Sequence, residues 1–126
     1  MLERTNDTQL RILLIEDNPG DARLIRDMLV RARGMACEPE WVENLTAGIE
    51  RLKEQPFDVV LLDLGLPECQ GICTLHRLLA EAPSASTVIV MSGLNDEDVA
   101  VQAVQSGAQD YLVKGHVDSA LLTRSI

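Results

Sequence analysis

Five polar side chains each follow a short apolar run of the sequence, and their types suit the chemistry of phosphate and a divalent cation. They are three acids, a hydroxyl and an amine: Glu16, Asp17, Asp63, Ser92 and Lys114. Neighbouring carboxylates repel one another unless a cation or a proton intervenes, and oxygen ligands of this kind suit Mg²⁺. A lysine and a hydroxyl beside them could hold a phosphoryl group, and an aspartate can accept one as an acyl phosphate. The set therefore predicts a site for Mg²⁺ and a transferable phosphoryl group.

The elements that must position these side chains are strands alternating with helices. The strands are expected at 11–16, 36–43, 57–62, 87–91 and 110–113, and the helices between Asn18 and Gly34 and at 44–55, 71–80, 95–107 and 118–126. Apolar strands joined by helices predict a parallel sheet with helices on both faces. Such sheets bind ligands at the carboxyl ends of their strands, so the five polar side chains would meet at that edge. Pro39 favours an edge position for the second strand.

Size and charge indicate one soluble domain. The chain has 126 residues, with a tail expected at 1–10 and the domain at 11–126. A net charge of −9 disfavours direct binding to nucleic acid or to an anionic membrane. The N-terminal segment is polar and no apolar run approaches the ~20 residues that span a bilayer, so we expect a cytoplasmic protein. Only about two turns of the last helix fit before Ile126, which leaves two alternatives open: a stand-alone domain with a short last helix, or a truncated helix in a natural chain that continues.

The three cysteines, Cys37, Cys69 and Cys73, are an odd number without a secretion signal, which favours free thiols in a reducing compartment. If the third helix included them, Cys69, Cys73 and His76 would share one face, which suggests zinc or redox chemistry. A structural zinc site usually needs four ligands, and no fourth is evident. Small buried thiols and a solvated histidine are therefore the simpler expectation. Trp41 is most simply a packing residue of the second strand.

Four blocks of the sequence, in this order and with this spacing, resemble the signature segments of response-regulator receiver domains of two-component signalling. They are LLIEDNPGD, VVLLDLGLP....G, VIVMSG and DYLVKG, and the resemblance covers roughly residues 11–126. It implies a flavodoxin-like, doubly wound α/β fold whose five-stranded parallel sheet has the order 2-1-3-4-5. It also implies that the domain is not an enzyme with its own substrate, beyond catalysing its own phosphorylation and dephosphorylation.

The resemblance assigns roles to the acids and to one glycine. Asp63 resembles the phosphoacceptor, and Asp17 resembles the direct Mg²⁺ ligand, with Glu16 acting on the ion through water. Gly65, two residues after the acceptor, would offer its backbone carbonyl to the metal. Mg²⁺ is therefore the implied cofactor.

Three further residues match the phosphoryl-binding and switching positions of the family. Lys114 would pair with the phosphoryl oxygens, and with the acceptor carboxylate before phosphorylation. Ser92 matches the switch hydroxyl, and Tyr111 matches the aromatic residue that turns inward with it. Two positions depart from the commonest pattern. Gly115 stands where a proline is usual, and Leu94 places a bulky apolar side chain beside the acceptor.

The resemblance implies a sensor histidine kinase or a phosphotransfer protein as donor, and an output domain, fused or separate, as recipient of the signal. A dimer through the helix at 95–107, the strand at 110–113 and the helix at 118–126 is a further implication. Two alternatives stay open: a receiver-like interaction module that no longer switches, and an enzyme on the same fold. The enzyme alternative lacks a glycine-rich phosphate loop, and Gly65 stands where a haloacid-type phosphatase needs a second aspartate.

Overall fold

Strands and helices alternate along the chain as predicted. The computed structural model describes residues 11–33, 39–67, 69, 71–82, 87–93 and 97–114. Its elements are β1 (Ile12–Ile15), α2 (Pro19–Arg33), β2 (Glu40–Val42), α3 (Leu45–Glu54), β3 (Val59–Asp63), α4 (Ile72–Glu81), β4 (Val88–Ser92), α5 (Glu97–Ser106) and β5 (Asp110–Val113). Several predictions fall outside the described residues: the tail at 1–10, the helix end at Gly34, the helix start at 95–96 and the helix at 118–126.

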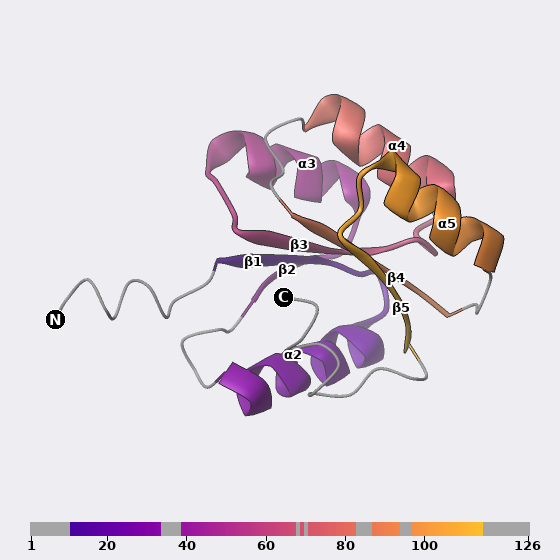
Figure 1. The fold of residues 1–126 in the computed structure, drawn as a ribbon. Helices are drawn as coiled ribbons and strands as arrows, with labels where there is room; N and C mark the ends of the chain where they lie inside the picture. The colour runs from indigo at the N-terminus through magenta and orange to yellow at the C-terminus, as the bar shows by residue number, and fades with distance from the viewer. Residues whose placement is uncertain are drawn as a thin grey trace, which may run out of the picture.

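The strands form one parallel sheet in the order β2-β1-β3-β4-β5, which confirms the order that the family resemblance implied. Figure 1 shows α2 on one face of the sheet and α3, α4 and α5 on the other. Every residue of β1, β3 and β4 is buried, because helices cover both faces, and this explains their continuous apolar sequences. The strand β2 lies at an edge, as Pro39 predicted, and begins directly after that proline.

Successive residues of each strand face opposite layers, so the core divides into two clusters. The cluster under α3, α4 and α5 includes Leu13, Ile15, Val60, Leu62, Val88 and Val90 from the sheet, with Leu45, Ile49, Leu52, Leu75, Leu78 and Ala103 from the helices. The cluster under α2 includes Ile12, Leu14, Leu61, Ile89, Met91 and Leu112 with Ala22, Ile25 and Leu29. Burial of both faces fixes the register of the strands, because a slip of one residue would exchange the two sets.

Two asparagine caps set where the first two helices begin. Asn18 Oδ1 accepts a hydrogen bond from the Asp21 N–H at 3.0 Å, and Asn44 Oδ1 accepts one from the Ala47 N–H at 2.7 Å. Both bonds satisfy backbone donors that the first turn leaves without a partner. The predicted cap at Asn18 is thereby confirmed. None of the helices within the described ranges combines the length and the apolar character required to cross a bilayer.

Gly48 allows α3 to approach β1 closely. A Cβ atom at this position would lie 2.4 Å from Ile15 Cδ1 and 2.8 Å from Ile15 Cγ1, and Ile15 is fully buried. We expect Gly48→Ala to lower the free energy of unfolding by about 1–2 kcal/mol, because overpacking exceeds the gain in helix propensity. Urea denaturation followed by circular dichroism measures the change. Glu50→Ala, on the exposed side of the same helix, serves as the control and should be nearly neutral, whereas a stabilised Gly48→Ala would contradict the close approach.

Cys69 and Cys73 form a disulfide, so the expectation of free, buried thiols is wrong for these two residues. The helix α4 begins at Ile72, and Cys69 therefore lies in the preceding loop instead of one helical turn before Cys73. That position brings their Cα atoms to 5.9 Å, within the range that a disulfide requires. Cys73 is exposed, and so is His76, as predicted for the histidine. Because the two sulfurs are bonded to each other, the shared-face zinc site is excluded in this state.

Candidate functional site

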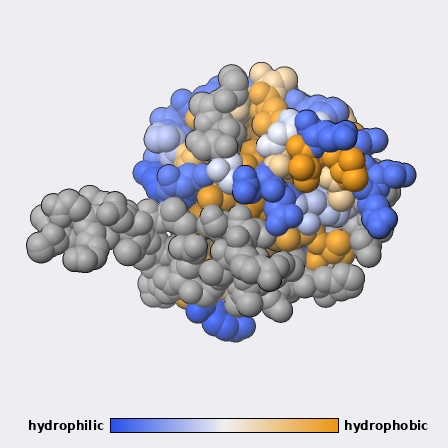
Figure 2. Space-filling view, in the orientation of Figure 1, coloured by the Kyte–Doolittle hydropathy of each residue, from blue (hydrophilic) through white to orange (hydrophobic). Residues whose placement is uncertain are grey.

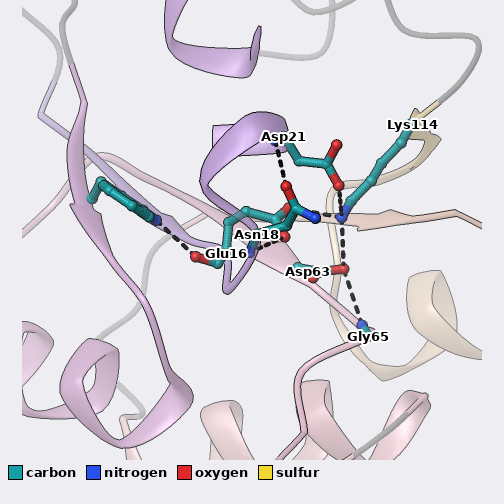
Figure 3. Close-up of polar contacts among 7 residues, drawn as sticks. Glu16, Asn18, Asp21, Asp63, Gly65 and Lys114 are labelled. Carbon is teal, nitrogen blue, oxygen red and sulfur yellow. Dashed lines mark hydrogen bonds and ion pairs between the residues drawn. The ribbon is translucent and has the colours of Figure 1, made fainter. Parts of the chain in front are cut away.

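The predicted acids and the lysine meet at the carboxyl edge of the sheet. Glu16 directly follows β1, Asp63 ends β3, Ser92 ends β4 and Lys114 directly follows β5. Figure 3 shows the side chains of Glu16, Asp63 and Lys114 converging with that of Asp21 from α2. The β3 and β4 strands each run one residue further than predicted, so Asp63 and Ser92 are paired strand residues opposite Met91 and Val113. Both are therefore held by the sheet itself and not by a loop.

Lys114 is the cation at the centre of this edge. Its Nζ atom lies 2.8 Å from Glu16 Oε1, 3.0 Å from Asp21 Oδ2 and 3.3 Å from Asp63 Oδ1. Burial alone would lower the pKa of Lys114, but the contacts with Glu16, Asp21 and Asp63 outweigh it and raise the pKa. The lysine therefore stays charged and holds the three carboxylates together. Its predicted pairing with the unphosphorylated acceptor is present.

Asp63 is almost wholly buried at the end of β3, with 3% of its surface exposed. Its Oδ1 accepts a hydrogen bond from the Gly65 N–H at 3.0 Å and contacts Lys114. A Cβ atom at Gly65 would lie 3.5 Å from that oxygen, in ordinary contact, so a side chain there would cover the carboxylate. At Gly65 there is no side chain to contact the acceptor carboxylate. Whether its carbonyl serves a metal stays a prediction.

Glu16 is a carboxyl group buried without full compensation. Its side chain is fully buried, its Oε2 accepts a hydrogen bond from the Asn18 N–H at 3.2 Å, and its Oε1 faces Lys114. Apart from that ion pair, Oε1 has no hydrogen-bond partner within the described ranges. Burial, with a smaller contribution from Asp63, raises the pKa of Glu16 to about 7 although Lys114 opposes the rise. A second cation here would stabilise the ionised form.

The three acids predicted as metal ligands fit a divalent cation. Glu16, Asp17 and Asp63 each offer a carboxylate oxygen, and these oxygens all lie within 4.8 Å of one another. Asp17 is exposed while the other two are buried, so an ion could approach from solvent on the Asp17 side. Hard oxygen ligands and an excess of negative charge suit Mg²⁺, which keeps several waters when one or two carboxylates hold it. The buried Glu16 carboxyl, whose pKa is raised although Lys114 contacts it, agrees with this fit.

Asp21 and Trp41 belong to the site although sequence reasoning did not select them. Asp21 pairs with Lys114 from the first turn of α2, and its position in the DNPGD turn, four residues after Asp17, was the available signal. Trp41 was expected to pack in the sheet, but it is 40% exposed and its indole N–H donates to the Glu16 carbonyl at 2.7 Å. This bond ties the edge strand β2 to the acidic loop. A strand tryptophan gives no sequence signal for such a bond.

The two predicted switch residues lie on adjacent strands. Ser92 is buried at the end of β4, and Tyr111 is half-buried in β5, opposite Val90, and packs against the core cluster under α3–α5. Their roles as switch residues, and a switching movement, stay predictions. The departures at Leu94 and Gly115 fall outside the described residues.

A groove lined in part by Trp41 lies next to this edge. It has a volume of about 250 Å³ and is lined by Leu14, Pro19, Ala22, Arg23, Arg26, Pro39 and Trp41. It contains none of the three metal-fitting acids or Lys114, and it is bordered by α2 and the β2 edge. The acidic edge of the sheet, and not this groove, therefore has the groups for phosphoryl chemistry.

Comparison with known proteins agrees with this geometry. A family model described as the response regulator receiver domain matches residues 12–125. The transcriptional regulatory protein ZraR of Klebsiella oxytoca is 33% identical over 106 residues, which make up 84% of this chain but only 23% of ZraR. The chemotaxis protein CheY of Bacillus subtilis (strain 168) is 31% identical over 104 residues, 82% of this chain and 84% of CheY. The chain thus spans most of one relative and about a quarter of the other.

A solved structure of similar fold contains a phosphorylated aspartic acid and a metal ion. It is the crystal structure of a response regulator protein from Burkholderia pseudomallei with a phosphorylated aspartic acid, a calcium ion and citrate. The TM-score is 0.74 and the sequence identity 27%, over 91% of this chain and 65% of that chain.

Proposed function

The chain belongs to the response regulator receiver domain family, and we propose that it accepts a phosphoryl group on Asp63 from a phosphohistidine of a partner protein. The observation that carries the proposal is the buried Asp63 carboxylate, held 3.3 Å from Lys114 beside two further acids. A sensor histidine kinase or a phosphotransfer protein is the donor. The domain catalyses its own phosphorylation and dephosphorylation and turns over no other substrate.

The residues at the carboxyl edge of the sheet have different roles in the phosphoryl transfer. An Asp63 oxygen attacks phosphorus, the O–P bond forms as the N–P bond of the phosphohistidine breaks, and the leaving imidazole keeps the bonding electrons and takes a proton. Lys114 is placed to neutralise charge that develops on the phosphoryl oxygens. Glu16, Asp17 and Asp63 would hold Mg²⁺, which supplies charge neutralisation when bound. Water later cleaves the O–P bond, which returns the carboxylate and releases inorganic phosphate.

The output follows from a shift between two states of the domain. We propose that Ser92 bonds the phosphoryl group and that Tyr111 turns inward as it does so. The surface that changes includes α5 and β5. Figure 2 shows apolar residues reaching the surface among hydrophilic ones over the α4 and α5 region, and Val101 and Val104 of α5 are each more than half exposed. This surface suits an output domain or a second copy of the chain.

The proposal is tested by incubating the chain with Mg²⁺ and a small phosphodonor and measuring its intact mass. We expect a single phosphoryl adduct that forms only when Mg²⁺ is present and that is lost over time after the donor is removed. Chelation of the metal should prevent the adduct. Absence of any adduct at millimolar Mg²⁺ would instead favour an interaction module that no longer switches.

Asp17→Asn is expected to remove most of the Mg²⁺ affinity without unfolding the domain. Asp17 is exposed, so its amide replacement leaves the core unchanged. In the wild-type chain, Mg²⁺ at a hundred times its Kd should stabilise the fold by roughly 2.7 kcal/mol, and Asp17→Asn should lose most of this increment. Thermal unfolding with and without Mg²⁺ measures it. Asp27→Asn, at an exposed position of α2, is the control and should keep the increment; an undiminished increment in Asp17→Asn would remove Asp17 from the ligand set.

A further inference from the structure

The Cys69–Cys73 disulfide lies in the segment that connects the acceptor strand to α4. Asp63 is the last residue of β3, and Cys73 is the second residue of α4. The bond therefore joins the loop that follows the acceptor to the first turn of the next helix. Cys73 is exposed and Cys69 is half-buried, so solvent reaches one of the two residues readily.

Backbone contacts connect this bond to the residues next to the acceptor. The Gly71 N–H donates to the Leu64 carbonyl at 2.8 Å, and the Cys69 N–H donates to the Leu66 carbonyl at 3.4 Å. The Thr74 hydroxyl donates to the Cys69 carbonyl, and Thr74 is fully buried. Since Leu64 and Leu66 are buried directly after Asp63, the loop is held on both sides of the disulfide.

We propose that Cys69 and Cys73 form a reversible thiol–disulfide site, which reacts with low-molecular-weight thiols and disulfides and controls how firmly the β3–α4 segment is held beside Asp63. The pairing and exposure of the two cysteines carry the chemistry of the site. Its effect on phosphorylation rests in addition on the function proposed above for Asp63.

The exchange balances with a small thiol as the reductant. A thiolate of the small molecule attacks Cys73 Sγ, the protein S–S bond breaks, and Cys69 leaves as a thiolate that takes a proton. A second small thiolate attacks its counterpart in the mixed disulfide, which frees Cys73 and yields the small-molecule disulfide. Two electrons pass from two small thiols to the protein. Oxidation by a small disulfide, such as oxidised glutathione, is the reverse sequence.

Ordering of the acceptor loop links the redox state to the function. The disulfide closes a ring of five residues, which restricts the conformations of the loop before α4. The reduced segment keeps its hydrogen bonds to Leu64 and Leu66 but opens more often. Because the Gly65 N–H that bonds Asp63 belongs to the same segment, we expect the oxidised form to be the faster phosphoacceptor.

The chemical part of the proposal is tested by counting thiols. The chain is equilibrated in buffers that contain reduced and oxidised glutathione at several ratios, alkylated, and weighed. We expect one alkylated cysteine, Cys37, under oxidising conditions and three under reducing conditions, with no stable intermediate population carrying glutathione. Three alkylated cysteines at every ratio would overturn the site. Cys73→Ser cannot close the protein disulfide, so Cys69 should be either free or bound to glutathione and the variant should show no internal disulfide at any ratio.

The functional part uses hydrogen exchange and phosphorylation on the same samples. Reduction should speed exchange of the Gly71 and Thr74 amides roughly tenfold and slow adduct formation roughly threefold or more. Cys73→Ser should match the reduced wild-type chain in both buffers, while Cys37→Ser should respond like the wild type. If the oxidised and reduced chains differed in hydrogen exchange but were phosphorylated at the same rate, the link between the disulfide and Asp63 would be overturned. If neither state formed a phosphoryl adduct, the proposed function would be rejected, and the thiol counts alone would decide whether the redox site exists.

Discussion

Asp63→Asn is expected to abolish phosphoryl incorporation, with a residual rate below about 1% of the wild-type chain, because a neutral amide is not a nucleophile for phosphorus. The change keeps the shape of the side chain. An asparagine Oδ1 still accepts the Gly65 N–H hydrogen bond, and the strand pairing opposite Met91 involves only the backbone. The loss should therefore be one of chemistry and not of folding.

The measurement is intact mass after incubation with Mg²⁺ and a small phosphodonor, with circular dichroism to verify the fold. Asp58→Asn is the matched control. Asp58 lies just before β3 and its Oδ2 accepts the Arg11 N–H at 2.8 Å, a bond that an asparagine oxygen can replace. This variant should be phosphorylated at the wild-type rate. An adduct that persists undiminished in Asp63→Asn would place the acceptor elsewhere.

The fold was predictable because its strands are short, apolar and regularly separated by amphipathic helices. Periodicity alone indicated a parallel sheet with helices on both faces, and the position of Pro39 indicated the edge strand. The order of the strands is different in kind. It depends on pairing between strands that are distant in the sequence, which periodicity does not show, and it was predicted only from the resemblance to a family. The predicted ends of two strands were one residue short, because the observed strands end at Asp63 and Ser92. A polar side chain interrupts the apolar pattern, but its backbone still pairs with the neighbouring strand.

The site was predictable where residues follow strands and not where they come from elsewhere. Parallel strands bring their carboxyl ends together, so Glu16, Asp63 and Lys114 could be grouped from their positions alone. Asp21 enters from a helix, and Trp41 enters through a side-chain bond to a backbone carbonyl. Spacing places Asp21 four residues after Asp17 but does not indicate its ion pair with Lys114, and nothing in the sequence indicates the Trp41 bond.

The disulfide was missed for another reason. The odd number of cysteines without a secretion signal favoured free thiols, and the shared face of Cys69, Cys73 and His76 required a helix that extends back to Cys69, three residues before its observed start. In the structure α4 begins only at Ile72, and the loop conformation before it turns Cys69 toward Cys73. The sequence gives no signal for the conformation of this loop, which is what brings the two cysteines together.

Lys114→Met is expected to slow phosphorylation about 100-fold, because the charge that faces the phosphoryl oxygens is removed while the apolar stem remains. The same change leaves Glu16 and Asp63 without their common cation. Removing one partner of a buried pair is strongly destabilising, but the lysine is partly exposed and Glu16 can take up a proton, so we expect a loss of about 1–3 kcal/mol in the free energy of unfolding. Lys53→Ala, at an exposed position of α3, is the control for both measurements.

The response to Mg²⁺ distinguishes the slower phosphorylation expected of Lys114→Met from a loss of Mg²⁺ binding. Lys114→Met removes the positive charge that neutralises part of the negative charge of the four acids at the edge, Glu16, Asp17, Asp21 and Asp63. The variant should therefore bind Mg²⁺ more tightly, and gain more stability from it, than the wild type does. Asp17→Asn should do the opposite. Titration of thermal unfolding with Mg²⁺ at fixed ionic strength distinguishes the two. If Lys114→Met lowered the Mg²⁺ affinity and the phosphorylation rate together, Lys114 would act by holding the acids in place, and its role at the phosphoryl oxygens would be rejected.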